Sequence, residues 1–396
     1  MDLAYRAFDA DNHYYESRDA FTRYIDPAFA DQAVRPLFEA DGTEEIYIGD
    51  RRFTFLEHRN YDTAPRPGML REMLKAMKWG DDGGNIKGTR VSEPHRPEYV
   101  KRSARVQVLD AQGIEAAVLY PTLAVCVEHY MVDDPDLLYA NLSAFNRWLD
   151  DEWGLNRDGR IHAPPLLSLV DPDRAVEELE WALDRGARVV SLRPGPAAGR
   201  NIADPVFDPF WARINEAGAV VGFHIGESGY NQSMSVHWGE EPNPPSHRQS
   251  ALQWTCFYGD RPIMETVAAL IYANLFDAFP NVRVMSVENG SLWVGYLMAA
   301  MNKMNRMGRN GPWFRGPLTE KPSDVFRRHV FVSPHHEEPV ADLARSIGVS
   351  QVLFGSDWPH AEGLAEPLEF VEGLSSLSPT ETRLIMRDNL AGLLAS

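Results

Sequence analysis

The stretch AVVGFH at residues 219–224 decides the fold class that we predict for this chain. It is apolar until its last residue, and a strand has this composition when both faces of its sheet are buried, as in a parallel sheet. A similar run, VVSL at residues 189–192, lies before it, and an amphipathic segment separates the two. Apolar runs that alternate with amphipathic segments predict βα units.

Eight such apolar runs occur along the 396 residues. We predict strands at residues 5–11, 116–120, 163–170, 188–192, 219–224, 282–288, 329–332 and 351–355. Helical spacing predicts helices after Asp171-Pro172, which supplies a cap and a proline at the first helical position, and over residues 204–218 and 292–307. Eight strands with intervening helices predict an α/β fold, a (β/α)8 TIM barrel.

Two predicted connections are much longer than ordinary loops. Residues 14–99 follow the first strand and contain a predicted β-hairpin over residues 45–55 that turns at Gly49-Asp50. Residues 226–262 follow the fifth strand and form a lid-like loop rich in Pro, Ser, Trp and Asn. Both leave the carboxyl ends of strands, where barrel active sites lie. We therefore expect residues 1–396 to form one elaborated barrel domain with long insertions after strands one and five.

Composition limits the partners and the location. Acidic residues outnumber basic residues by 57 to 39, which gives a formal net charge of −18. This charge repels nucleic-acid phosphates and anionic membranes, so we expect a small-molecule substrate and neither of those partners, and a homodimer stays open. No apolar stretch approaches the roughly 20 residues of a membrane helix. Residues 1–6 lack the pattern of a secretory signal, so we expect a cytoplasmic protein.

Histidine and carboxylate side chains are the candidates for a metal site. The only two cysteines, Cys126 and Cys256, form no CxxC pair, whereas the chain has twelve histidines. Residues two apart on a strand point the same way, so Asp11 and His13 can share a ligand.

Five such residues lie at or just beyond the ends of four predicted strands: Asp11, His13, His224, Glu288 and Asp357. Each one alone has an ordinary explanation as a turn, a helix cap or a satisfied core histidine. A carboxylate that closes a buried strand is nevertheless costly unless it is paired or binds a cation. Strands one, five, six and eight of a barrel end at one cavity, so together these residues predict a metal centre.

The chain resembles the amidohydrolase superfamily over its whole length. The motifs that carry the resemblance are FDADNH at residues 8–13, GIEAAVLYPT at 113–122, VGFHIGESGY at 221–230 and LFGSDWPH at 353–360. The most similar branch is the amidohydrolase-2 group, which includes aminocarboxymuconate-semialdehyde decarboxylase. The resemblance implies the barrel fold and metal ligation by Asp11, His13, His224 and Asp357.

Three features depart from the pattern of the superfamily. The first strand carries Asp11 in a DxH motif, where relatives commonly have HxH or ExH. Glu288 stands where relatives usually carry a histidine that acts with the eighth-strand aspartate in decarboxylation. Arg193, and no lysine, ends the fourth strand, so a bridging carbamate is not expected. Glu288 could instead bind a second cation, and it favours hydrolysis over decarboxylation.

Two histidines and three carboxylates suit one or two divalent ions of Fe, Zn or Mn, and a binuclear site is favoured. The leading hypothesis is a hydrolase, in which a metal-bound hydroxide cleaves a carboxylic ester, thioester, amide or lactone of an apolar or aromatic substrate. Asp357 would be the general base and His224 a ligand in the catalytic centre. The alternatives are metal-dependent non-oxidative decarboxylation of an aromatic or unsaturated acid, and a barrel that binds a ligand without turnover.

Substrate contacts are predicted in the loops at the same end of the barrel. Arg193 can pair with a substrate carboxylate or form a salt bridge within the protein, and the two explanations are equally good. His360 and the run 335–337 could orient the substrate, although the run could equally be a solvated loop. Trp254 and Tyr230, with Phe257, Tyr258 and Trp293, suggest an apolar or aromatic substrate, whereas core packing explains such residues about as well.

Overall fold

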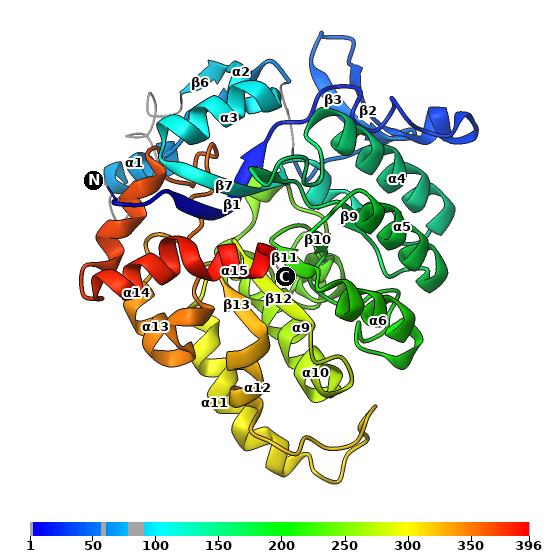
Figure 1. Ribbon diagram of the computed structural model, residues 1–396. Coiled ribbons are helices and arrows are strands. Elements are labelled where there is room, and N and C mark those ends of the chain that lie inside the picture. Colours follow the sequence, from blue (N-terminus) through cyan, green and yellow to red (C-terminus); the bar gives the residue numbers. More distant parts are fainter. Residues whose placement is uncertain (1–2, 57–60, 78–90, 396) are drawn as a thin grey trace.

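Parallel strands at the centre of Figure 1 pair in the order in which they follow along the chain. The structure is a computed structural model that describes residues 3–56, 61–77 and 91–395. One run of strands pairs β1 with β7 and β7 with β8, and a second run extends from β9 to β13. Their bounds are β1 (Ala7–Tyr14), β7 (Ile114–Pro121), β8 (Ile161–His162), β9 (Leu166–Leu167), β10 (Val189–Leu192), β11 (Val220–His224), β12 (Arg283–Val287) and β13 (Val330–Val332).

The segment at residues 351–358 closes the barrel between β13 and β1. The amide of Leu353 donates to the carbonyl of Val332 at 2.9 Å, and the amide of Ala10 donates to the carbonyl of Phe354 at 2.8 Å. The eighth segment therefore bonds to the last strand on one side and to the first strand on the other. The predicted (β/α)8 barrel is present.

Three strands differ most from their predicted bounds. β1 continues to Tyr14, three residues beyond the predicted end. The third predicted strand, at residues 163–170, is divided into β8 and β9, because Pro164 and Pro165 between them have no amide hydrogen for the ladder. The eighth, at residues 351–355, makes a single bridge, between Val352 and Val332, in place of a continuous ladder.

Helices surround the strands (Figure 1). The helix after Asp171 illustrates why they form, because the Asp171 carboxylate accepts from the amides of Asp173 and Arg174, and Gly186 beyond the helix has a φ of 81°. The predicted helix at residues 292–307 has the same bounds in the structure. The helices are α3 (Arg102–Ala111), α4 (Pro135–Glu152), α5 (Pro172–Asp184), α6 (Asp208–Ala217), α9 (Asp260–Tyr272), α10 (Leu275–Ala278), α11 (Leu292–Met307), α12 (Pro322–His329), α13 (Val340–Ile347) and α14 (Pro379–Arg383).

A C-terminal helix, α15 (Asn389–Ala395), covers one end of the barrel (Figure 1). Its leucines, Leu390 among them, share a buried apolar cluster with barrel side chains such as Val118 and Met285. The side-chain amide of Asn389 donates to the carbonyl of Val352 at 2.8 Å, where the eighth segment begins. α15 therefore lies at the amino ends of the strands and leaves the carboxyl ends for a functional site.

The first insertion forms two small antiparallel sheets. β2 (Val34–Phe38), β3 (Glu44–Ile48) and β4 (Arg51–Arg52) make one, in which Ile48 pairs with Arg51 around the predicted turn at Gly49-Asp50. β5 (Thr63–Pro65) and β6 (Ser92–Pro94) make the other, accompanied by α1 (Met69–Ala76) and α2 (Pro97–Val100). Residues 57–60 and 78–90 of this predicted insertion lie outside the described residues.

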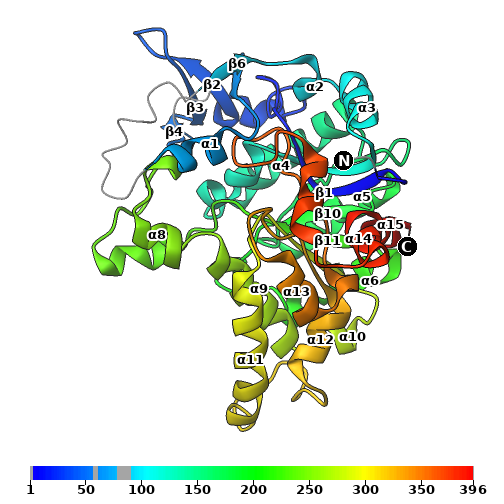
Figure 2. The ribbon, with the colours of Figure 1, turned by 90° about the vertical axis from the view of Figure 1, so that its left-hand side faces the viewer.

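The second insertion carries α7 (Tyr230–Ser233) and α8 (Ala251–Cys256). The amide of Ser246 donates to the carbonyl of Phe55 at 2.8 Å, so the two insertions contact each other. Figure 2 shows α1, β4 and α8 on the side of the barrel opposite α15, which is the side of the strands' carboxyl ends.

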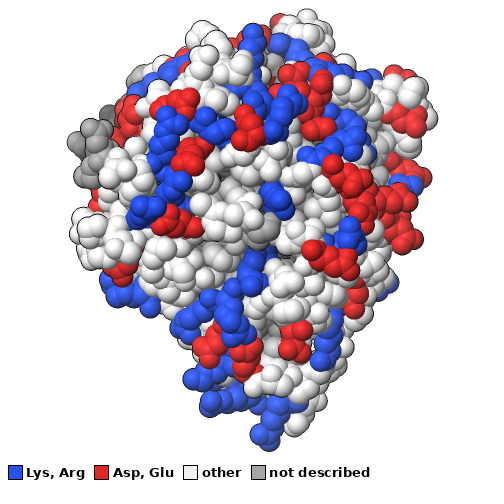
Figure 3. Space-filling view, viewed as in Figure 1, with Lys and Arg blue, Asp and Glu red and all other residues white. Residues whose placement is uncertain are grey.

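The surface is charged with both signs. On the face seen in Figure 3, acidic and basic side chains are interspersed although the chain has a net charge of −18. Within the described part of the chain, no helix combines the length and the apolar character that a bilayer crossing requires.

Candidate metal centre

β1 carries Asp11 and His13 on the inside of the barrel. Both side chains are buried, with 3% and 0% of the residue surface exposed, and residues two apart on a strand share one side. Oδ1 of Asp11 lies 3.2 Å from Nε2 of His13. Gly355 in the neighbouring segment makes room for the pair, because a Cβ atom there would lie 2.7 Å from the Cβ of Asp11.

His224, the last residue of β11, faces this pair. Its Nδ1 lies 2.7 Å from the carbonyl oxygen of Ile225, a contact that needs a proton on Nδ1. The lone pair of a neutral ring is then on Nε2, which lies 3.3 Å from Nε2 of His13. A backbone contact of this kind orients histidines that bind metal ions.

Glu288 and Asp357 approach from the loops after β12 and the eighth segment. Oε2 of Glu288 lies 3.1 Å from Nε2 of His224, and Oδ1 of Asp357 lies 3.2 Å from Nε2 of His13. Both acidic residues have left-handed backbones, with φ values of 56° and 53°. Residues other than glycine adopt this conformation rarely, and it is concentrated at functional sites. The sixth strand thus ends at Val287, one residue earlier than predicted, and Glu288 belongs to the loop.

The electrostatics of the cluster favour a positive charge at its centre. Burial lowers the pKa of His224, but its contacts with Asp11 and Glu288 outweigh burial and raise that pKa to about 10. Burial, together with repulsion by Glu288, raises the pKa of Asp357 well above its ordinary value. A cation here would relieve the repulsion between the carboxylates and replace protons on the histidines.

The described residues contain two overlapping groups whose ligand atoms lie within 4.8 Å of one another. The first group is Asp11, His13, His224 and Glu288, and the second is His13, Glu288, Asp357 and His360. All five residues predicted as metal ligands therefore lie together, and we call these five residues the floor. Their imidazole nitrogens and carboxylate oxygens fit a divalent cation such as Mn, Fe or Zn.

His360 extends the floor toward one wall. Its Nδ1 lies 2.8 Å from Oδ1 of Asp357, and its ring stacks on that of His13 with centroids 3.8 Å apart. Its Nε2 lies 3.0 Å from Oγ1 of Thr122, whose hydroxyl donates to the carbonyl of Tyr14 at 2.9 Å. Asp357, His360 and Thr122 thus form a chain of polar contacts from the floor to the backbone of β1.

A buried network joins β1 to the segment that carries Asp357. The Asp9 carboxylate accepts from the amide and the hydroxyl of Ser356, at 3.0 and 2.5 Å, and from the side-chain amide of Asn12 at 3.0 Å. Arg105 donates to the side chain of Asn12 at 2.5 Å. All four side chains are buried. Asp9 is therefore placed to fix the position of Asp357 relative to β1.

The floor lies at the base of a cavity of about 710 Å³. Above it, both insertions contribute apolar side chains, and we call six of them the roof. The roof consists of Phe55, Leu56, Pro65, Leu70, Trp254 and Tyr258. The run 335–337, for which the sequence left two explanations open, also lines this cavity.

Of the four predicted substrate-binding residues, His360 and Trp254 line the cavity. Arg193 and Tyr230 are not among the described residues that line it. The Arg193 guanidinium donates to the carbonyl of Ser228 at 2.9 Å and lies 3.5 Å from Oε1 of Glu128. The structure thus places Arg193 in the internal salt bridge that was its alternative explanation. The Tyr230 hydroxyl donates to Glu265 at 2.7 Å, so it too is engaged within the protein.

Sequence reasoning missed Asp9, Thr122 and the roof residues of the first insertion. Asp9 carried a usable signal, because it lies two residues before Asp11 on the same strand and is a costly residue to bury without partners. Thr122 follows β7 directly, and its position at a strand end was the available signal. Phe55 and Leu70 lie in a long connection, where periodicity does not tell which side chains point to the cavity.

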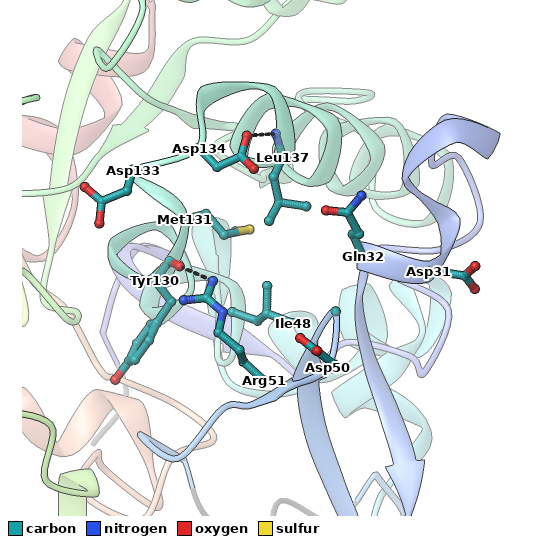
Figure 4. A pocket seen from close by; sticks show the side chains of 11 residues that line it. Asp31, Gln32, Ile48, Asp50, Arg51, Tyr130, Met131, Asp133, Asp134 and Leu137 are labelled. Carbon is teal, nitrogen blue, oxygen red and sulfur yellow. Dashed lines mark hydrogen bonds between the residues drawn. The ribbon is translucent and has the colours of Figure 1, made fainter.

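A second cavity, of about 560 Å³, lies between the β3–β4 hairpin and the start of α4 (Figure 4). Its lining includes Asp50 and Asp133, and Arg51 donates to the carbonyl of Tyr130 at 2.8 Å. Among the described residues, no three metal-binding side chains converge there. The cavity above the floor is therefore the candidate active site.

Comparisons with known proteins identify the family to which this fold belongs. An amidohydrolase from Mycobacterium avium subsp. paratuberculosis K-10, solved by crystallography, is 38% identical, covers 99% of this chain and 100% of its own, and superposes with a TM-score of 0.90. The gamma-resorcylate decarboxylase of Rhodococcus jostii (strain RHA1) is 23% identical over 328 residues, which are 79% of this chain and 93% of that protein.

A dihydroxybenzoic acid decarboxylase from Polaromonas sp. JS666, crystallised with manganese and the inhibitor 2-nitroresorcinol, shares the fold at 15% identity. It covers 99% of this chain and 97% of its own, with a TM-score of 0.61. The profile of the amidohydrolase family matches residues 89–394, which is most of the chain and includes His224, Glu288 and Asp357. The resemblance inferred from the sequence is confirmed, and the protein belongs to the amidohydrolase family.

Proposed function

We propose that this protein is a metal-dependent, non-oxidative decarboxylase of an aromatic carboxylic acid. The observation that carries the proposal is the convergence of the floor residues beneath an apolar and partly aromatic roof in one cavity. The similarity to decarboxylases of hydroxylated benzoic acids supports this reaction over hydrolysis, which was the leading hypothesis from the sequence.

A single cation suits the floor better than the binuclear centre favoured by the sequence. Both ligand groups include His13, which faces the other ligands with one nitrogen, Nε2. One nitrogen lone pair binds one metal ion, so the two groups cannot both bind an ion through His13. We infer one divalent ion, held by Asp11, His13, His224 and Glu288, with Asp357 beside it. This arrangement supports decarboxylation, which needs no activated water.

When bound, the cation would supply Lewis acidity and hold the substrate carboxylate. The protein's own residues supply the proton. Loss of carbon dioxide breaks the bond between the ring carbon and the carboxyl carbon and leaves the electron pair on the ring carbon. A protonated Asp357 then donates its proton to that carbon and forms the new C–H bond. His360, 2.8 Å from Asp357, is placed to return a proton to it.

The contacts of His360 support a proton relay at this point. The Thr122 hydroxyl donates its hydrogen to Tyr14, so in its contact with His360 it accepts from Nε2–H. Nδ1 of His360 lies 2.8 Å from Oδ1 of Asp357, so the imidazole ring lies between this carboxyl group and the hydroxyl of Thr122.

Hydrolysis of an ester, thioester, amide or lactone is the second candidate. Glu288 favours it, because this residue replaces the histidine that the family resemblance associates with decarboxylation, and its Oε2 lies 3.1 Å from Nε2 of His224. In hydrolysis, Asp357 would begin the reaction by accepting a proton. The two reactions thus require opposite protonation states of the same carboxyl group.

Product analysis separates the candidates. The Mn²⁺-loaded protein is incubated with hydroxylated benzoic and naphthoic acids, and in parallel with aryl esters, thioesters and lactones. The proposal expects release of carbon dioxide from an acid, which the Asp357→Asn variant abolishes. Release of an alcohol or thiol without carbon dioxide would establish hydrolysis instead. If the protein binds metal and ligand but forms neither product, the remaining hypothesis is a barrel that binds a ligand without turnover.

A further inference from the structure

The cavity is larger than one aromatic ring requires. We propose that the substrate's carboxylate-bearing ring continues into an uncharged, apolar body, such as a second fused ring, that lies against the roof. This inference rests on the proposed function, because it specifies the substrate of the same site.

The first argument is volume. About 710 Å³ lies within the range of pockets that bury drug-sized ligands. A single benzoate ring fills only part of that space and leaves water against the apolar roof. Removing such water from apolar surface is favourable, so a ligand that extends to the roof binds more tightly than one that does not.

The second argument is that the roof is already assembled. The rings of Phe55 and Tyr258, from different insertions, have centroids 6.0 Å apart, and those of Tyr258 and Trp254 are 5.0 Å apart. The amide of Ser246 donates to the carbonyl of Phe55 at 2.8 Å, and the amide of Leu70 donates to that of Ala361 at 2.8 Å. These contacts hold both insertions together and tie the first one to the loop that follows His360. A preformed apolar wall binds a ligand without a large ordering cost.

The third argument is charge. No lysine or arginine occurs among the described residues that line the cavity. The floor presents three carboxylates, and a divalent cation there already has these and the substrate carboxylate as its anionic partners. A second carboxylate or a phosphate on the substrate would meet no permanently charged cation and would share the cavity with Glu337 and Glu362, which also line it. The body of the substrate is accordingly uncharged.

Equilibrium binding of non-reactive probes tests this inference separately from the reaction. In each probe a nitro group takes the place of the carboxylate. The probes are 2-nitrophenol with one ring, 2-nitro-1-naphthol with two rings, and the two-ring probe with an added carboxylate on its second ring. Quenching of tryptophan fluorescence reports binding, in the Mn²⁺-loaded and the metal-free protein.

We expect the neutral two-ring probe to bind about tenfold more tightly than the one-ring probe. The added carboxylate should remove this gain.

Two variants on the same helix locate the effect. Leu70, which is 36% exposed, lines the cavity, whereas Leu74, one turn later on α1 and 56% exposed, is not among its lining residues. Leu70→Trp should abolish the preference for the two-ring probe and leave binding of the one-ring probe within about twofold, and Leu74→Trp should change neither.

Equal or weaker binding of the two-ring probe to the unmodified protein would overturn the inference, as would equal weakening of both neutral probes by Leu70→Trp. If carbon dioxide is never released but the two-ring preference and its loss in Leu70→Trp are found, only the proposed reaction fails.

Discussion

The floor and the roof of the cavity are built in opposite ways. The floor side chains come from the ends of four barrel strands and are held by the parallel backbone ladders and the network around Asp9. The roof side chains come from two long connections, which meet through the hydrogen bond between Ser246 and Phe55 and through ring contacts. Loops on a rigid scaffold can change without disturbing it. We therefore propose that the floor determines the reaction and that the roof determines which substrate is accepted.

This division predicts different kinetic signatures. A change in the floor should lower kcat for every substrate. A change in the roof should alter KM for some substrates and not others.

Replacement of Asp357 by Asn should have the greatest effect. Asparagine keeps the shape but cannot transfer a proton, so kcat should fall by about 10²–10⁴-fold for every acid tested. Steady-state assays of the metal-loaded variant measure this, and Asp342→Asn, an exposed aspartate paired with Arg345, is the matched control. A variant that keeps more than about a tenth of the activity would remove Asp357 from the proton transfer.

Metal affinity should fall as the pH is lowered. Burial opposes protonation of His224, but Asp11 and Glu288 raise its pKa to about 10 in the metal-free protein, so a cation must displace a proton at neutral pH. The dissociation constant should therefore rise by about tenfold for each unit of decreasing pH per displaced proton.

Competition titration with a chromophoric chelator measures this dependence.

The same raised pKa of His224 predicts how the stability of the metal-free fold depends on pH. The stabilisation of the metal-free fold by His224 is fully present below its ordinary pKa of 6.5 and is lost as the pH rises through about 10. A metal affinity independent of pH would contradict the assignment of the histidines as ligands.

Replacement of Asp9 by Asn tests the support beneath the floor. The amide would direct a donor at Ser356 or Asn12, which already donate to Asp9, and the segment carrying Asp357 would shift. We expect the metal affinity of the folded variant to fall by about 10–100-fold, as for other residues that orient metal ligands. Calorimetric titration with Mn²⁺ measures this. A lower Tm with unchanged affinity would assign Asp9 to stability alone.

Replacement of Trp254 by Ala should have the smallest effect and a different signature. Its side chain lines the mouth of the cavity and is 47% exposed, so KM for a two-ring acid should rise by a few-fold, roughly 3–10-fold, with a much smaller change in kcat. Trp238→Ala, in the same insertion but 73% exposed, is the control. If kcat fell as much as it does in floor variants, the separation of floor and roof would be wrong.

The same division explains what the sequence could predict. The positions of His224 and Asp357 followed from strands that end at one edge of a barrel, and the structure brings them together with Asp11, His13 and Glu288. The left-handed backbone conformation of Glu288 was not predictable, because the pattern of apolar residues does not indicate which residue after a strand has a positive φ.

Arg193 illustrates a case that the sequence left open between a substrate contact and an internal salt bridge. Its partners in the structure are Glu128 and the backbone carbonyls of Ser228 and Pro196. Phe55 and Tyr258 meet through the packing of two long connections, which no local periodicity encodes. Most of the site residues fixed by the barrel were therefore predictable, although Asp9 and Thr122 were missed. Of the roof residues fixed by loop contacts, only Trp254 and Tyr258 were named as candidates.

The most direct test of the central claim follows the fate of the carboxyl group and the proton together. An aromatic acid labelled with ¹³C at its carboxylate is turned over by the Mn²⁺-loaded protein in D₂O, and products are identified by NMR and mass spectrometry. The account predicts ¹³C in carbon dioxide and one deuterium on the ring carbon that carried the carboxylate. Intact labelled acid, accompanied by hydrolysis of its esters or thioesters, would contradict it.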